Sequence, residues 1–100
     1  MTVTLQDEFG GVIDEVHDIG GLISALLPSL EDDSYTCLRF IDPYGDTYFN
    51  RLQMRLFIAE WGRTFGMPHS EKAKELFGRI KGLAERCAIE PHLYLKFMGD

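Results

Sequence analysis

The sequence lacks the segments that direct a chain into or across a membrane. Its longest apolar-rich stretch, residues 19–30, is interrupted by glycine, serine and proline and falls short of the roughly 20 apolar residues that cross a bilayer. The first residues, 1–5, have neither the basic start nor the apolar core of a signal peptide. We therefore expect a cytoplasmic protein without a membrane span.

Cysteine is scarce, and the few histidines are scattered. Cys37 and Cys87 each lie in an apolar periodic segment, Cys37 in an expected strand, and this is typical of a buried, inert thiol. His17, His69 and His92 never recur at the spacing that places two imidazoles on one helical face. No phosphate-binding glycine loop is found either. The sequence therefore predicts no enzyme activity, no metal and no cofactor.

Positive charge is almost missing from the first half of the chain. Residues 1–50 hold ten acids and a single base, Arg39, and carry a net charge of −9, whereas residues 51–100 carry +3. The sum of −6 disfavours nucleic acid as a ligand because phosphates would be repelled. The asymmetry favours attraction between the halves or a basic protein partner, although an acidic surface also serves solubility alone.

Hydrophobic periodicity predicts eight elements in the order β-β-α-β-β-α-α-β. The first two strands flank Gly10-Gly11, a pair suited to a tight hairpin turn. Apolar residues three and four positions apart indicate the helices, with Asp18 and Ser70 as N-caps and Gly62 and Gly66 as stop signals. The expected strands are 2–8, 12–17, 35–41, 47–49 and 92–98, and the expected helices are 19–27, 51–62 and 71–87.

The element order predicts one α+β domain over residues 1–100. Two hairpins require antiparallel pairs, because parallel strands need a long crossover. We expect a two-layer sandwich with a mainly antiparallel five-stranded sheet and three helices on one face. The alternation in 92–98 turns Leu93, Leu95 and Phe97 toward the helices and leaves the opposite side chains on an open face.

The segment 42–46, Asp-Pro-Tyr-Gly-Asp, is the most distinctive local feature. It is consistent with ordinary turn chemistry, with a recognition loop, or with a weak cation site helped by the acidic loop 31–33. Two arginines one helical turn apart either neutralise these acids, stay solvated or dock an anionic group. The candidate partner-binding residues are Glu31, Asp32, Asp33, Asp42, Tyr44, Asp46, Arg51 and Arg55. Trp61 and Phe65 favour core packing, with an aromatic anchor as the alternative.

In size, acidity and lack of catalytic motifs the chain resembles small bacterial immunity and adaptor proteins, a likeness that carries over no functional residues. The first hypothesis is a protein-interaction domain that presents an acidic, tyrosine-bearing surface to a basic partner. The second is a self-associating structural module, a homodimer paired through the open sheet face or an edge strand at 92–98. The third is a small-ligand domain with a polar pocket between sheet and helices, for which the candidates are His17, Asp18, Arg39 and Tyr48.

Overall fold

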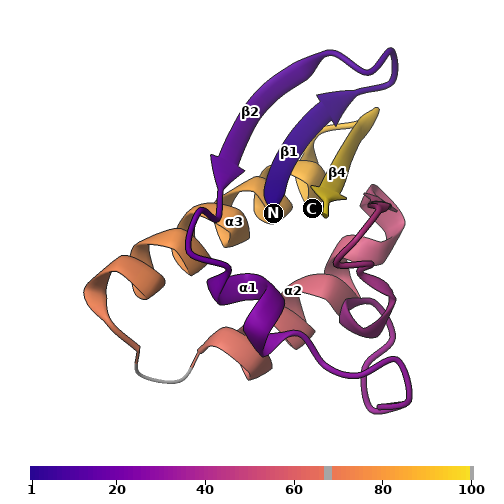
Figure 1. Ribbon diagram of the computed structural model, residues 1–100. Helices are drawn as coiled ribbons and strands as arrows, with labels where there is room; N and C mark the ends of the chain where they lie inside the picture. Colours follow the sequence, from indigo (N-terminus) through magenta and orange to yellow (C-terminus); the bar gives the residue numbers. More distant parts are fainter. Residues whose placement is uncertain (67–68, 100) are drawn as a thin grey trace.

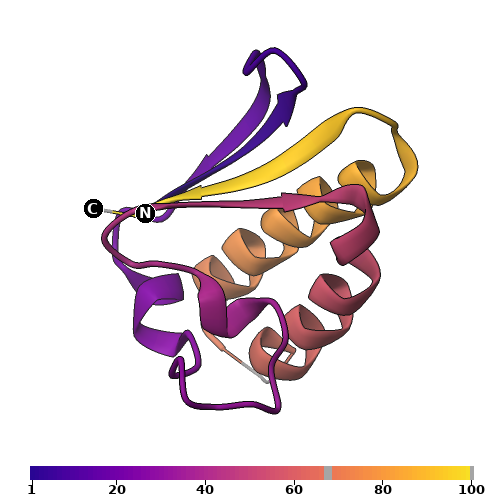
Figure 2. The same cartoon turned by 90° about the vertical axis from the view of Figure 1, so that its right-hand side faces the viewer.

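A computed structural model, which describes residues 1–66 and 69–99, has an α+β architecture with an antiparallel sheet on one side and helices on the other (Figures 1 and 2). The α+β class predicted from the sequence is therefore confirmed. Its elements are β1 (Thr2–Asp7), β2 (Val12–His17), α1 (Leu22–Leu26), the 3-10 helix η1 (Leu38–Phe40), β3 (Asp46–Asn50), the 3-10 helix η2 (Arg51–Gln53), α2 (Met54–Phe65), α3 (Glu71–Ile89) and β4 (Leu93–Met98).

The described strands form one four-stranded sheet in the order β2-β1-β4-β3, with every neighbouring pair antiparallel. The first predicted hairpin is confirmed, since β1 pairs with β2 in a register that joins Thr2 to His17. Its turn is fixed by Asp7, whose carboxylate accepts the amides of Phe9 at 2.9 Å and Gly11 at 2.8 Å. Gly10 adopts a φ of 83°, which favours glycine.

The prediction of a strand at 35–41, with Cys37 inside it, is wrong. This segment is a loop that ends in η1, and β3 pairs with β4 instead of with a preceding strand. The physical reason is that the amides of residues 36–38 are taken by the side chain of Glu60, so they are not offered to a neighbouring strand. The described sheet therefore has four strands instead of five, and the second predicted hairpin does not form.

The helices match the prediction best where the apolar pattern is longest. The helix expected at 71–87 is confirmed and runs to Ile89, and the hydroxyl of Ser70 caps it by accepting the amide of Ala73. The helix expected at 51–62 begins with the single turn η2 and reaches Phe65, ending at Gly66 instead of Gly62. The glycine at 62 lies inside the helix.

The first helix is shorter than expected, because 19–27 contains only five helical residues, Leu22–Leu26. Gly21 precedes it with a φ of 68°, outside the right-handed region. The expected cap is nevertheless used. The buried carboxylate of Asp18 accepts the amides of Leu22 at 2.9 Å and Ile23 at 2.7 Å from beyond the glycines.

The core lies between the sheet and the helices α2 and α3. Leu93, Leu95 and Phe97 of β4 point into it, as the alternation predicted. Phe97 meets Phe49 and Phe57 at ring-centroid distances of 6.0 and 5.7 Å, so aromatic contacts join the sheet to α2. Because β4 lies between β1 and β3, the expectation of an edge strand at 92–98 is wrong.

The outer face of the sheet is covered largely by its own side chains. Thr4 is fully buried there, and its hydroxyl accepts a hydrogen bond from Gln6 at 3.1 Å. Lys96 reaches across the face to Asp46, 3.6 Å away, and lies 5.1 Å from the ring centre of Tyr48. Tyr48 and Tyr94 on the same face stay exposed, at 54% and 37%, so pairing of this face with a second copy stays a prediction. Within 1–66 and 69–99, no helix is both long and apolar enough to cross a membrane.

Candidate functional site

One carboxylate fixes the chain before η1. Glu60 on α2 is only 8% exposed, and it accepts the amides of Thr36 at 2.9 Å and Leu38 at 3.0 Å. The amide of Cys37, between them, lies 3.0 and 3.2 Å from the two carboxylate oxygens. Charge-assisted bonds of this kind are stronger than neutral ones. Glu60 thus sets the path of a segment that is 22 to 24 residues away in the sequence.

Two further side chains of α2 hold the loop that contains the acidic residues 31–33. The guanidinium of Arg63 donates a hydrogen bond to the carbonyl of Ser34 at 2.7 Å and lies 4.0 Å above the ring of Tyr35. The hydroxyl of Thr64 donates to the hydroxyl of Tyr35 at 2.9 Å. The acidic loop is therefore attached to a helix at defined points.

A hollow with a volume of about 490 Å³ lies between α1 and η1, and we call it the α1–η1 hollow. Several of its wall residues are large, apolar and exposed, Leu30 at 57% and Phe40 at 53%. Ile41 and Leu27 are more buried and join the hollow to the core. The lining residues are Ser24, Leu27, Pro28, Ser29, Leu30, Arg39, Phe40, Ile41, Asp42 and Pro43.

The hollow places the two acidic segments of the first half on either side of an apolar surface. Leu30 on one wall leads directly into Glu31–Asp33, and Asp42 on the other begins the segment 42–46. Most of these acids are exposed, and the Tyr44 side chain is 85% exposed. Six of the eight residues predicted as a partner-binding surface therefore belong to segments that adjoin one hollow.

Local hydrogen bonds keep two of these acids charged. The hydroxyl of Ser29 donates to the carboxylate of Glu31 at 2.6 Å and lowers the pKa of Glu31. The pKa of Asp32 is lowered chiefly by hydrogen bonds from Ser34, and more weakly by the positive charges of two nearby arginines. Both carboxylates therefore stay ionised below their ordinary pKa, and the acidic flank keeps its charge at neutral pH.

The segment 42–46 shows the turn chemistry that its sequence predicts. The carboxylate of Asp42 accepts the amide of Tyr44 at 2.8 Å, and the Asp42 amide donates to the hydroxyl of Thr47 at 3.0 Å. A β-carbon on Gly45 would lie 2.7 Å from an Asp42 carboxylate oxygen, so a larger residue there would require the Asp42 side chain to shift. The Tyr44 ring is held at the surface by a rigid turn. Recognition by this turn stays a prediction.

The arginines predicted to offset the acidic loops lie elsewhere. Arg51 and Arg55 are exposed, and neither forms an ion pair with a carboxylate in the part of the chain that the structure describes. Asp46 instead pairs with Lys96, and Asp32 is near Arg39 and Arg63. The acidic segments adjoining the hollow are therefore not neutralised by the predicted pair.

Among the described residues that line the hollow, Arg39 is the one basic side chain, and its position there could not be predicted from the sequence. Its guanidinium lies 4.7 Å from the ring centre of Phe40 and donates to the carbonyl of Leu30 at 3.4 Å. Its Nε is buried without a hydrogen-bond partner. Arg39 thus connects the two apolar walls. Sequence reasoning also missed Glu60, although a lone acid on the stripe of Phe57 and Trp61 is a signal of a buried anchor.

The polar cluster expected for a small-ligand pocket is not assembled. His17 and Asp18 lie together in a shallow recess, whereas Arg39 lines the hollow and Tyr48 lies on the outer sheet face. Among residues 1–66 and 69–99, no three histidine, cysteine, aspartate or glutamate side chains are placed to hold a metal ion.

The two thiols are free, buried and hard to ionise. Burial raises the pKa of both Cys37 and Cys87 to about 11, and the charge of Glu60 adds to the effect at Cys37. Because the thiolate is the nucleophile, both thiols are unreactive at neutral pH.

Comparison of the chain with known protein families, with curated proteins and with solved structures finds no significant match. The function is therefore argued from the geometry.

Proposed function

We propose that the chain is a protein-interaction domain whose α1–η1 hollow receives an apolar side chain of a basic partner. The observation that carries the proposal is an apolar recess of about 490 Å³ with an acidic segment on either side. Protein interfaces commonly have a desolvated centre and a polar rim. Here Leu30 and Phe40 supply the centre, and the acids of 31–33 and 42–46 supply the rim.

The charges of the hollow favour a basic segment over a neutral or acidic one. The flanking segments contribute five carboxylates, and Arg39 is the only basic residue in the lining. Asp46 pairs with Lys96, and Asp32 lies near Arg39 and Arg63. Glu31, Asp33 and Asp42 have no described ion pair, so negative charge is in excess beside the hollow. A Lys or Arg side chain of the partner would gain long-range attraction, which raises the association rate. Tyr44 would add an aromatic contact of the kind that is frequent at interfaces.

The proposal includes the role of an immunity or adaptor protein that acts in the cytoplasm. In either role a small domain masks or recruits a basic surface, and catalysis is not needed. The rigid attachment of the loop through Glu60 and Arg63 supports this role, because an ordered surface loses less entropy when it binds.

Selection of peptides from a random display library on the immobilised protein tests the proposal directly. We expect the selected peptides to share an apolar residue flanked by Lys or Arg. Binding of a selected peptide should weaken at least about tenfold in Leu30→Ser and Phe40→Ser, because each removes an exposed wall of the hollow. Leu52→Ser removes a leucine that is even more exposed, at 77%, and does not line the hollow, and it should bind like the parent protein.

The charge part of the proposal has its own control. Asp33→Asn removes an exposed rim charge and should slow association and reduce its dependence on salt. Glu85→Gln removes an exposed charge from α3 and should leave both unchanged. Peptides without basic residues, or peptides that bind Leu30→Ser and Phe40→Ser as well as the parent, would contradict the proposal.

A further inference from the structure

A second recess lies between α2 and α3 and shares no lining residue with the α1–η1 hollow. Its volume is about 430 Å³, and we call it the α2–α3 groove. Both walls are helical, so its shape is set by regular backbone. The lining residues are Trp61, Gly62, Phe65, Gly66, Lys74, Phe77, Gly78 and Lys81.

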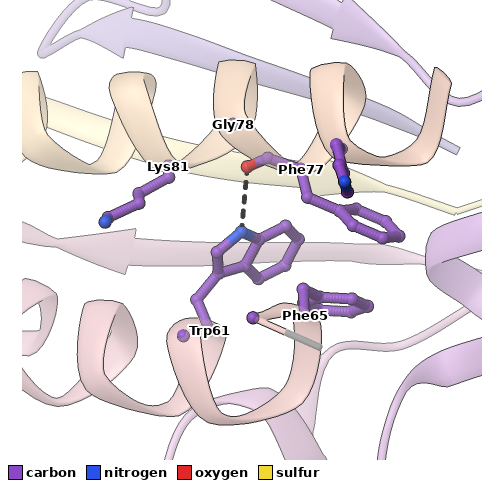
Figure 3. Close-up of a pocket in the computed structure, with 8 residues that line it drawn as sticks. Trp61, Phe65, Phe77, Gly78 and Lys81 are labelled. Atoms are coloured by element: carbon purple, nitrogen blue, oxygen red, sulfur yellow. Dashed lines mark hydrogen bonds between the residues drawn. The ribbon is translucent and has the colours of Figure 1, made fainter. Parts of the chain in front are cut away.

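The floor of the groove is aromatic, and the indole N–H of Trp61 is already used in a hydrogen bond within the protein. The Trp61 ring lies against Phe65 at a centroid distance of 4.1 Å and meets Phe77 edge-on at 6.3 Å. The indole N–H donates to the carbonyl of Phe77 at 3.0 Å, shown as the dashed line in Figure 3. The floor is therefore apolar, but Trp61 is only 2% and Phe77 only 4% exposed, so a small part of each ring is open to the groove.

Two glycines keep the groove open. Gly62 and Gly78 lie inside facing helices, and a β-carbon added to either would meet no atom within 4 Å. Neither has a positive φ. Close packing and backbone conformation therefore do not require glycine here, although glycine weakens a helix relative to alanine. What the two glycines provide is empty space above the aromatic floor.

The rim of the groove is positively charged. Lys74 and Lys81 are seven residues apart on α3, which separates them by roughly 10 Å along the helix axis. Lys74 pairs with Glu71 at 3.5 Å. Lys81 has no ion pair with any residue of 1–66 or 69–99. Figure 3 shows Trp61 in the middle, with the rings of Phe65 and Phe77 on one side and Lys81 on the other.

We infer that the α2–α3 groove binds a small amphipathic anion, an apolar or aromatic carboxylate. Its body would lie between Gly62 and Gly78, against the small open part of the Trp61 ring, and its carboxylate at Lys81. Charge complementarity selects this ligand, because a cation would be repelled by the two lysines and a neutral molecule would leave Lys81 unused. The volume lies within the range of small-molecule sites. This site is independent of the proposed partner surface.

The tryptophan at the groove floor is the only one in the chain, so its fluorescence reports directly on the site. The protein would be titrated with 4-phenylbutyrate, 4-phenylbutan-1-ol and 4-phenylbutylamine, which share one apolar body and differ in charge. We expect a saturable change with the carboxylate, and binding at least about tenfold weaker for the alcohol and the amine.

Matched variants separate binding in the groove from general effects. Lys81→Gln should weaken carboxylate binding about tenfold, whereas Lys72→Gln, which removes an exposed lysine of α3 outside the groove, should not change it. Gly78→Leu fills the groove and should abolish the signal. Glu85→Leu adds the same side chain at an exposed position outside the groove and should not. Thermal melting verifies that each variant is folded.

Three results would overturn the inference. The first is the absence of a saturable signal up to millimolar carboxylate, and the second is equal binding of the three compounds. The third is a Trp61 fluorescence that changes with protein concentration in the absence of ligand, together with loss of this concentration dependence in Phe9→Ser. Phe9 is 89% exposed at the tip of the β1–β2 hairpin beside Asp7 and Glu8, so this result would show that a second copy occupies the groove.

Discussion

The α1–η1 hollow and the α2–α3 groove are similar in volume but are built in different ways. The hollow is formed largely by loop and 3-10 segments that are held by side chains such as Glu60 and Arg63. The groove is formed by two helices. The backbone hydrogen bonds of each helix lie within that helix, and the two helices contact each other through a cluster of aromatic rings. The hollow therefore depends on a few polar contacts, whereas the groove depends on helix backbone and on aromatic packing.

The two recesses also differ in the sign of their charge. Carboxylates adjoin the hollow, and two lysines line the groove. The charge asymmetry of the sequence, −9 and +3 in the two halves, is therefore kept as two separate surfaces in the fold. Few ion pairs cancel it, since among residues 1–66 and 69–99 only Lys96–Asp46 and, when the histidine is protonated, His92–Glu8 join a base of the second half to an acid of the first. The two proposals therefore assign ligands of opposite charge to the two recesses.

The largest expected effect comes from removing the anchor of the hollow. Glu60→Ala leaves two buried amides and one partly buried amide without their acceptor, and we expect it to lower the free energy of unfolding by about 3 kcal/mol or more. Glu60→Gln keeps the size and one acceptor oxygen and should cost less. Urea denaturation measures both. A loss below about 1 kcal/mol in Glu60→Ala would show that the hollow does not depend on this contact.

The two buried cysteines give a second way to compare the regions. Cys37 lies beside the Glu60 anchor, whereas Cys87 is on α3. With a pKa of about 11 in place of 9.0, each thiol should react with iodoacetamide at pH 8 about 100-fold more slowly in the folded chain than in the unfolded one. Because folding raises both values, this contribution to stability is complete below pH 9 and is lost as the pH rises toward 11.

The same reaction separates the two thiols. Glu60→Gln removes a negative charge that raises the pKa of Cys37, so Cys37 should react faster in this variant. Cys87 has no such neighbour among the causes of its shift and should keep its rate. Peptide mapping by mass spectrometry distinguishes the two sites. Equal acceleration at both would mean that the variant opens the whole fold.

The helical region could be predicted from the sequence because its signals are local. The apolar repeat of 71–87 and the Ser70 cap specify α3 within the span of the helix itself. The β1–β2 hairpin is likewise specified by its glycine turn and by the alternation on both sides. The backbone hydrogen bonds of α3 lie within the helix, and β1 pairs on one side with β2, the next strand in the chain.

The region around the hollow could not be predicted, because its contacts are distant in sequence. Residues 35–41 have the composition of a strand, but tertiary contacts override such propensities. Glu60 takes their amides from a helix that begins 13 residues after Ile41. The acidic residues proposed to bind a partner could be picked out from the composition of the sequence. Leu30 and Phe40, the apolar residues between them, form one surface only when the loop is folded.

The smallest expected effect tests whether the glycines of the groove are there for space. Gly78→Ala should raise the free energy of unfolding by about 1 kcal/mol, because alanine is the better helix former and its methyl group meets no atom within 4 Å. Gly66→Ala is the matched opposite, since its methyl would collide with the carbonyl oxygen of Gly62, and it should destabilise the fold. Thermal or urea unfolding measures both. If Gly78→Ala were destabilising, the glycine would have a packing role, and the groove would be a by-product of that role instead of an opening that the chain maintains at a cost to helix stability.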